Sequence, residues 1–326
     1  MSTIQILIHA LPREIDGLER VCDQLHRSSF FLENSDKVNL DITLNLSDEF
    51  TDWENSSLPK EFFIDKFKAI EIRSDWTNKN YFEISHGDIC SGCNDKRRNS
   101  IRQYSDQVSH FLYADPDIAF PIWGLYYMFR AIESINTNYH IISGEVLKLW
   151  DNSWDSIVNE RFINIPIDLE DFPNRKVRFY KEFDPYRLDS EFFTNIDSTD
   201  IKTVPNFKFA GGLFTCFSSN LLKFIDIPDE LGSYGLDDTY VLQCSQLMKQ
   251  MGYDIQQYAV KNLVVCESRR YKHFPAGFQD KNVEPNPYIK FLAQKVNEND
   301  RDNLAENAKK AYPHLINKFI QRANKK

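Results

Sequence analysis

The hydrophobic positions of the chain fall into short apolar runs that alternate with segments of helical spacing. Apolar runs predict strands at residues 3–10, 38–47, 67–74, 108–115 and 140–147. In the segments between them, at residues 16–28, 94–107 and 122–135, the pattern predicts helices. This alternation predicts an α/β protein with a mostly parallel central sheet and helices on both faces.

The regular pattern breaks in the middle of the chain and then returns. Residues 150–205 are rich in Asp, Asn, Phe and Arg and predict an insertion of short strands or ordered loops. Residues 207–225 predict a strand, a glycine pair and a helix, and residues 233–255 a glycine turn, two aspartates and an amphipathic helix. A last strand is expected at residues 260–268, followed by a polar helical tail.

Composition narrows the class of protein. The 326 residues carry a net charge of −9, which argues against broad binding to nucleic acid or to anionic lipid. No apolar run approaches the roughly 18–20 residues that span a bilayer, and the first apolar run is interpreted as a strand, not a signal peptide. Six scattered cysteines favour reduced thiols. We therefore expect a cytoplasmic protein.

The stretch FLYADPDIAFP places two aspartates, Asp115 and Asp117, at the end of a predicted strand. In an open α/β sheet, ligands bind beyond the carboxyl ends of the strands. Two carboxylates separated by one residue repel each other. A divalent cation bound between them would relieve this repulsion, and hard cations prefer such oxygen ligands. A surface turn is the plain alternative, and a second such triplet at Asp300-Arg301-Asp302 lies in the polar tail. The strand-end setting favours a metal site for the first triplet.

The order of these motifs resembles that of GT-A glycosyltransferases and is most similar to the glycosyltransferase family 2 pattern, over roughly residues 3–275. In that pattern a first strand ends in a turn that receives the nucleotide, and an Asp after the second strand holds the base. A glycine and an Arg-Asn pair then open a helix, and a DxD motif, a glycine-rich strand and an acidic pair follow in turn. The matching residues are Ala10, Leu11, Arg13, Asp48, Gly92, Arg97, Arg98, Asn99, Asp115, Asp117, Gly211, Gly212, Asp237 and Asp238.

The resemblance implies a donor and a mechanism. The donor is a nucleotide-diphosphate sugar, with uridine as the expected base, and the acceptor is a hydroxyl of a glycan or glycoconjugate. Mn²⁺ or Mg²⁺ is held by Asp117, Asp115 and a late His273, while Arg270 is expected to bind the diphosphate. Asp238 serves as general base and Asp237 orients a substrate, which implies inversion of the anomeric configuration.

The resemblance also implies the organisation of the chain. Residues 1–280 are expected to form the donor-binding and catalytic domain, with residues 150–205 as an acceptor-side insertion. Residues 281–326 are expected to form a helical extension that ends in a basic amphipathic helix. This extension either docks on its own domain or contacts a partner or the inner face of a membrane.

Departures from the pattern leave alternatives open. Ile118 replaces the usual carboxylate after the DxD motif, the acidic pair is Asp-Asp instead of Glu-Asp, and residues 150–205 have no counterpart. Helix capping alone accounts for an Asp at a helix start such as Asp238. A non-catalytic glycosyltransferase-like binding protein therefore remains an alternative. A sugar nucleotidyltransferase ranks lower, because the first strand is not followed by a glycine-rich loop.

Overall fold

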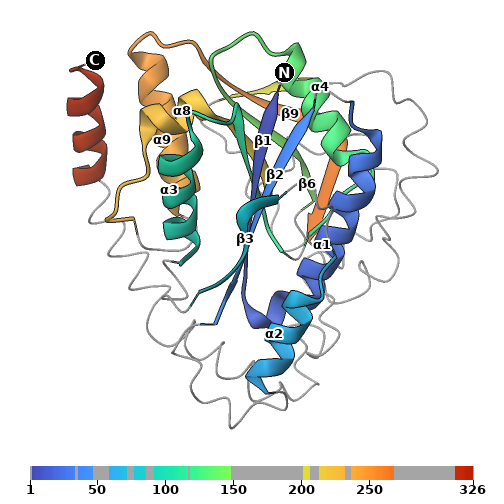
Figure 1. The fold of residues 1–326 in the computed structure, drawn as a ribbon. Coiled ribbons are helices and arrows are strands. Elements are labelled where there is room, and N and C mark those ends of the chain that lie inside the picture. Colours follow the sequence, from blue (N-terminus) through green and yellow to red (C-terminus); the bar gives the residue numbers. More distant parts are fainter. Residues whose placement is uncertain are drawn as a thin grey trace, which may run out of the picture.

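The structure is a computed structural model of the full chain. It describes residues 2–33, 36–46, 59–71, 77–85, 92–116, 118–147, 201–205, 213–231, 236–267 and 313–325. These residues form a mixed β-sheet between two layers of helices (Figure 1).

The strands are joined in the order β3-β2-β1-β4-β8-β6-β9-β5, and β7 pairs with β9. Their bounds are β1 Thr3–Ala10, β2 Lys37–Asn45, β3 Thr77–Ser85, β4 His110–Ala114, β5 Ile118–Ala119, β6 Tyr139–Leu147, β7 Ile201–Val204, β8 Phe214–Ser218 and β9 Ile255–Glu267. The first four strands in the sheet order are parallel neighbours, whereas β8 is antiparallel to both β4 and β6. The predicted α/β class is confirmed, with a sheet that is parallel in one half and mixed in the other.

Two groups of helices cover the two faces of the sheet. Their bounds are η1 Pro12–Glu14, α1 Ile15–Ser28, η2 Ser29–Phe31, α2 Lys60–Lys68, α3 Gly92–Tyr104, α4 Gly124–Ser134, α8 Ser219–Ile225 and α9 Leu236–Gln250, and residues 313–323 form a further helix. Figure 1 shows α1, α2 and α4 on one side and α3, α8, α9 and the C-terminal helix on the other.

The alternation of side chains along each strand explains the two layers. On β1, Ile6 and Ile8 join the core under α1, α2 and α4, while Leu7 joins the core under α8 and α9. On β4, Leu112 faces the first core and Phe111 the second. Strands buried on both faces read as continuous apolar runs, which is why these two strands are visible in the sequence.

One predicted strand is wrong. The run FKAIEIRS, predicted as a strand at residues 67–74, begins inside α2, and the next described strand is β3. In α2, Phe63 and Phe67 lie four residues apart and are both buried, as on one face of a helix. The Ile-Glu-Ile sequence alternates apolar and polar residues, which is the pattern expected of a half-buried strand, and this alternation misled the prediction.

The C-terminal helix docks on its own domain. Leu315, Phe319 and Ala323 are buried in the core that contains α8 and α9. Its cations are engaged as well, because Lys318 pairs with Glu230 and Arg322 with Asp226. The apolar side of this helix is therefore covered by the protein itself, which favours docking over the alternative of a partner or membrane contact for residues 313–323. Among the described residues, no helix is both long and apolar enough to cross a bilayer.

A buried histidine pair links β4 and β6 across β8. The Nε2 atoms of His110 and His140 lie 2.8 Å apart, and Nδ1 of His140 lies 2.7 Å from the carbonyl oxygen of Thr137. Nδ1 of His110 lies 2.9 Å from the Ser109 hydroxyl oxygen. Burial, together with the neighbouring His140, lowers the pKa of His110 to about 3, and burial lowers the pKa of His140. Both rings are therefore neutral at pH 7.

This pair should make the fold sensitive to mild acid. Unfolded histidine has a pKa near 6.5, so below that pH the unfolded chain binds protons that the folded chain excludes, and stability falls as the pH falls. Between pH 7.5 and 5.5 the pair should lower the free energy of unfolding by about 1–3 kcal/mol. Urea unfolding across this range measures the loss. His140→Gln should remove part of this contribution and the exposed control His314→Gln none of it. Equal acid sensitivity in wild type and His140→Gln would contradict the assignment.

Candidate functional site

The candidate site lies at the carboxyl ends of the parallel strands, where the first residues of α3 approach β1 and β2. A Cβ atom placed on Gly92 would lie 2.8 Å from Nδ2 of Asn45 and 3.1 Å from Nε2 of His9. Asn45 is the last residue of β2, and His9 is the penultimate residue of β1. The absence of a side chain at Gly92 thus allows the start of α3 to lie directly against both strand ends.

His9 is the residue at this edge that sequence reasoning missed. Its Nε2 atom is shielded from solvent and has no hydrogen-bond partner. Burial, with smaller effects from the cations of Arg97 and Lys96, lowers the pKa of His9 to about 4, so the ring is neutral at pH 7. A buried polar atom without a partner costs free energy, and a bound polar ligand would recover it. The only sequence signal is a histidine near the end of an apolar strand.

Two cations of α3 lie over the sheet beside His9. Nζ of Lys96 lies 2.7 Å from Oδ1 of Asp41, and both side chains are largely buried. The guanidinium of Arg97 lies over the ring of Tyr113, with Cζ 4.4 Å from the ring centroid. Tyr113 belongs to β4, so Arg97 ties α3 to the strand that leads into the DxD motif. Arg97 thus lies close to the candidate site, and its role in binding the donor stays a prediction.

Arg98, predicted as a donor ligand, faces away from this edge. Its side chain is 5% exposed, and it donates to the carbonyl oxygens of Ile227, Pro228 and Leu231. It also pairs with the carboxylates of Asp95 and Asp229. These contacts occupy the guanidinium within the protein, so we correct its role from donor binding to structure. The sequence shows the charge of Arg98 but not its carbonyl partners, which lie about 130 positions later in the chain.

The first strand and its turn hold three predicted donor residues. Ala10 and Leu11 are buried, and the backbone N–H of Leu11 donates to a carboxylate oxygen of Glu14 at 2.8 Å. This bond fixes the turn from β1 into η1, where Arg13 lies. The side chain of Arg13 and all of Asp48 lie outside the described residues.

Asp115 follows β4 directly, on the strand beside β1. Its backbone N–H donates to the carbonyl oxygen of Leu213 at 2.9 Å, which ties the beginning of the DxD motif to the residue before β8. Its side chain is partly buried. Ile118, the departure from the family pattern, is buried in the core, and its hydrocarbon side chain has no atom that could coordinate a metal. Asp117, the other aspartate of the motif, lies outside the described residues.

The remaining predicted residues are only partly placed. Asp237 and Asp238 lie in the first turn of α9, but their side chains are outside the described part of the structure. Gly211, Gly212, Arg270 and His273 fall wholly outside it. Within the described residues, no group of three or more His, Cys, Asp or Glu side chains is close enough to hold a metal ion. The roles of these residues remain predictions.

Taken together, the described residues define an α/β protein whose candidate site lies where β1, β2, β4 and α3 meet. No family model matches the sequence, and no curated protein matches it. Among solved structures, the chain is similar to S. aureus TarS 1-349, with 12% identity and a TM-score of 0.40 over 80% of this chain and 60% of that one.

Two further solved structures show a similar degree of likeness. S. aureus TarS gives 12% identity and a TM-score of 0.41 over 99% of this chain and 43% of that one. A mycobacterial protein gives 14% identity and a TM-score of 0.42 over 82% of this chain and 67% of that one. The chain spans about half the length of the TarS structures.

Proposed function

We propose that the protein is a metal-dependent glycosyltransferase of the GT-A type. It moves a sugar from a nucleotide-diphosphate donor, with uridine as the expected base, to a hydroxyl of a glycan or glycoconjugate. The observation that carries the proposal is the position of Asp115. This carboxylate follows β4 at the carboxyl edge of the sheet, next to β1, on the edge that α3 approaches through Gly92. Open α/β sheets bind their ligands at this edge.

The start of α3 supports a diphosphate at this edge. The N-terminus of a helix carries a partial positive charge and presents backbone N–H groups, both of which favour an anion. Arg97 adds positive charge within the first two turns of α3, whereas the charge of Lys96 is balanced by Asp41. His9 is neutral, and its unpartnered Nε2 can exchange a hydrogen bond with a bound nucleotide. The set therefore offers both charge for phosphates and a polar contact for a neutral part of the donor.

The chain's residues partly fit a divalent cation. Mg²⁺ typically takes one or two carboxylates and completes its shell with water and substrate phosphates, so Asp115 and Asp117 together suffice. His273 is the proposed third ligand. A bound Mn²⁺ or Mg²⁺ would neutralise charge that develops on the leaving diphosphate. Asp115 suits the role of a carboxylate ligand, because it lies at the end of a strand and remains partly exposed.

The acidic pair supplies the proton chemistry in this proposal. The acceptor hydroxyl loses its proton as it attacks the anomeric carbon, and Asp238 accepts that proton. Asp237, one position earlier in the first turn of α9, orients the acceptor or the sugar. Direct attack with one base needs no enzyme nucleophile and inverts the anomeric centre. In this proposal the acceptor is bound by the acceptor-side insertion, residues 150–205.

Nucleotide binding and transfer test the proposal together. A thermal-shift screen of nucleotides with and without Mn²⁺ should show stabilisation by a uridine diphosphate; at a hundredfold excess over Kd this is about 2.7 kcal/mol. Nucleotide-sugar hydrolysis or transfer should then depend on the metal and stop with EDTA. Binding without turnover would instead indicate the non-catalytic binding protein. Formation of a nucleotide sugar from a nucleoside triphosphate and a sugar 1-phosphate would indicate the nucleotidyltransferase, and no response to any nucleotide would contradict all three functions.

A further inference from the structure

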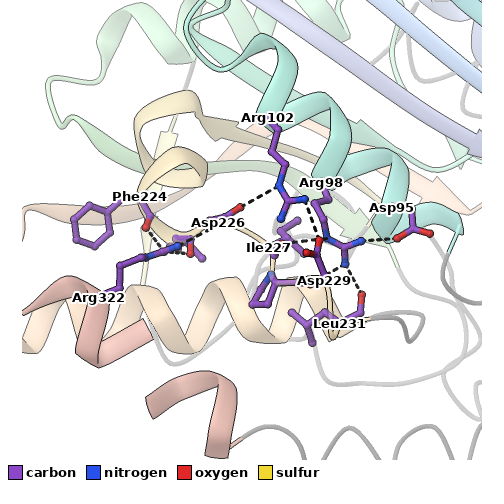
Figure 2. A network of polar contacts seen from close by, with 11 residues as sticks. Asp95, Arg98, Arg102, Phe224, Asp226, Ile227, Asp229, Leu231 and Arg322 are labelled. Atoms are coloured by element: carbon purple, nitrogen blue, oxygen red, sulfur yellow. Dashed lines mark hydrogen bonds and ion pairs between the residues drawn. The ribbon is translucent and has the colours of Figure 1, made fainter. Parts of the chain in front are cut away.

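The segment Phe224–Leu231, which comprises the last two residues of α8 and the six residues after it, is held by arginines from two sides. Figure 2 shows this network, with Arg98 and Arg102 reaching it from α3 and Arg322 reaching it from the C-terminal helix. We call it the clamped segment. It leads from α8 toward α9, and α9 begins at Leu236.

On the α3 side, the buried guanidinium of Arg98 makes most of the hydrogen bonds to the clamped segment. It donates from Nε to the carbonyl oxygen of Ile227 at 3.2 Å, and from Nη2 to those of Pro228 at 2.7 Å and Leu231 at 2.9 Å. Nδ2 of Asn94 reaches the same Leu231 oxygen at 3.4 Å. Because Arg98 is almost fully buried, its bonds are shielded from water and from salt, and replacing it would leave several carbonyl groups without a donor.

On the other side, the C-terminal helix contributes polar and apolar contacts. Nη2 of Arg322 donates to the carbonyl oxygens of Phe224 and Ile225, and its Nη1 lies 3.4 Å from Oδ2 of Asp226. The ring of Phe319 packs against that of Phe224, with centroids 6.0 Å apart. The carbonyl groups at the end of α8 therefore receive their donors from a helix nearly one hundred positions later in the chain.

Asp226 connects the two sides. Its Oδ1 atom lies 3.9 Å from Nε of Arg102 on α3, and its Oδ2 atom faces Arg322 on the C-terminal helix. Its backbone has φ 56° and ψ 123°, a conformation that a residue with a side chain adopts at a cost. Surroundings on both sides are thus needed to maintain the turn at which the chain leaves α8.

The first turns of α9 lie close to this clamp. Tyr240 of α9 is buried in the same core as Phe224 of the clamped segment and Phe319 of the C-terminal helix, and burial is the main cause of its raised pKa. Asp237 and Asp238 precede Tyr240 on the same helix by three and two positions. The clamped segment, the C-terminal helix and the turn of α9 that follows the acidic pair therefore share one buried core.

We propose that Arg98 and Arg322 are positioning residues, which fix the clamped segment from two sides and thereby set where α9 and its acidic pair begin. The C-terminal helix is then a part of the catalytic unit, although none of its residues touches a substrate. This inference rests on the proposed function for its effect on transfer. Its structural half, the coupling of the C-terminal helix to α9, stands without that function.

Amide hydrogen exchange tests the structural half. In Arg322→Ala, exchange in a peptide covering residues 236–244 should accelerate by on the order of tenfold, because local opening costs less when the clamp is lost. Arg322→Lys should recover part of the protection. Lys325→Ala, which changes an exposed cation two positions after the same helix, should leave the protection unchanged. Unchanged exchange in this peptide would overturn the proposal, as would an equal acceleration in β1 and β4, which would indicate a general loss of stability.

Transfer kinetics test the functional half. Arg322→Ala should lower kcat by about tenfold, since small displacements of a catalytic group have effects of this size, with the donor KM unchanged. Arg322→Lys should recover most of kcat, and Lys325→Ala should match wild type. A changed donor KM with an unchanged kcat would overturn the positioning role. If the wild-type protein transfers no sugar, the proposed function has failed, and the exchange experiment still decides whether the C-terminal helix controls α9.

Discussion

An Asp238→Asn variant should transfer sugar with a kcat lower by about 10²–10⁴-fold, the usual contribution of a general base. Asparagine keeps the size and hydrogen-bonding capacity of the side chain but does not accept a proton at neutral pH. The donor KM should change little, because the proposed diphosphate site lies beside α3 and the DxD motif. Initial rates at varied donor and acceptor concentrations separate the two constants.

Asp237→Asn is the matched control on the same turn of α9. It should reduce kcat less than Asp238→Asn, or should raise the acceptor KM. Both variants should lose no more than about 1–2 kcal/mol of stability, which is the scale of a lost helix cap. Near wild-type transfer by Asp238→Asn would leave that residue as a cap alone. The base would then have to be found among the acids of residues 150–205, such as Asp184 or Asp189.

An Asp117→Ala variant should lose Mn²⁺-dependent binding of the nucleotide sugar. The substitution removes a proposed metal ligand, and without the metal the charge of the diphosphate is poorly compensated. Isothermal titration calorimetry with the nucleotide, in the presence and absence of Mn²⁺, measures the effect. The thermal unfolding midpoint should stay close to that of wild type.

A matched control is available in the same chain. Asp302→Ala changes the second aspartate of the DxD triplet in the polar tail, and it should leave metal-dependent binding intact. Equal nucleotide affinity in Asp117→Ala and wild type, each with Mn²⁺, would remove the metal role from the DxD motif at residues 115–117.

The parts of the fold that the sequence predicts are those buried on both faces. β1 and β4 read as apolar runs because α-helical layers cover them from two sides. β3, by contrast, has the polar sequence TNKNYFEIS, and β5 and β7 contain only 2 and 4 residues. Such short or polar strands are specified by their neighbours in the sheet, which a local pattern does not contain.

For the candidate site as well, the sequence indicates features that depend on neighbouring residues and misses those that depend on distant parts of the chain. Asp115 could be located because a strand, a turn and a carboxylate follow one another in sequence. The role of Arg98 could not be predicted, because its acceptors are the backbone carbonyl groups of Ile227, Pro228 and Leu231. Every residue has a carbonyl group, so the residue types do not show which of them accept a hydrogen bond. His9 was missed for a related reason: its character comes from burial against α3, which is a property of the folded chain.

The late position of β9 has a consequence for how the protein is made. β9 pairs with β5, β6 and β7, all of which precede β9 in the chain. The pairing between β6 and β9 extends over β6 from Tyr139 to Leu147. On the ribosome, β6 therefore presents unpaired backbone groups and an apolar surface until residues 255–267 have emerged. Strand pairing between distant segments is slow, and such intermediates are prone to associate. Expression at reduced temperature or with added chaperones should therefore raise the yield of folded protein.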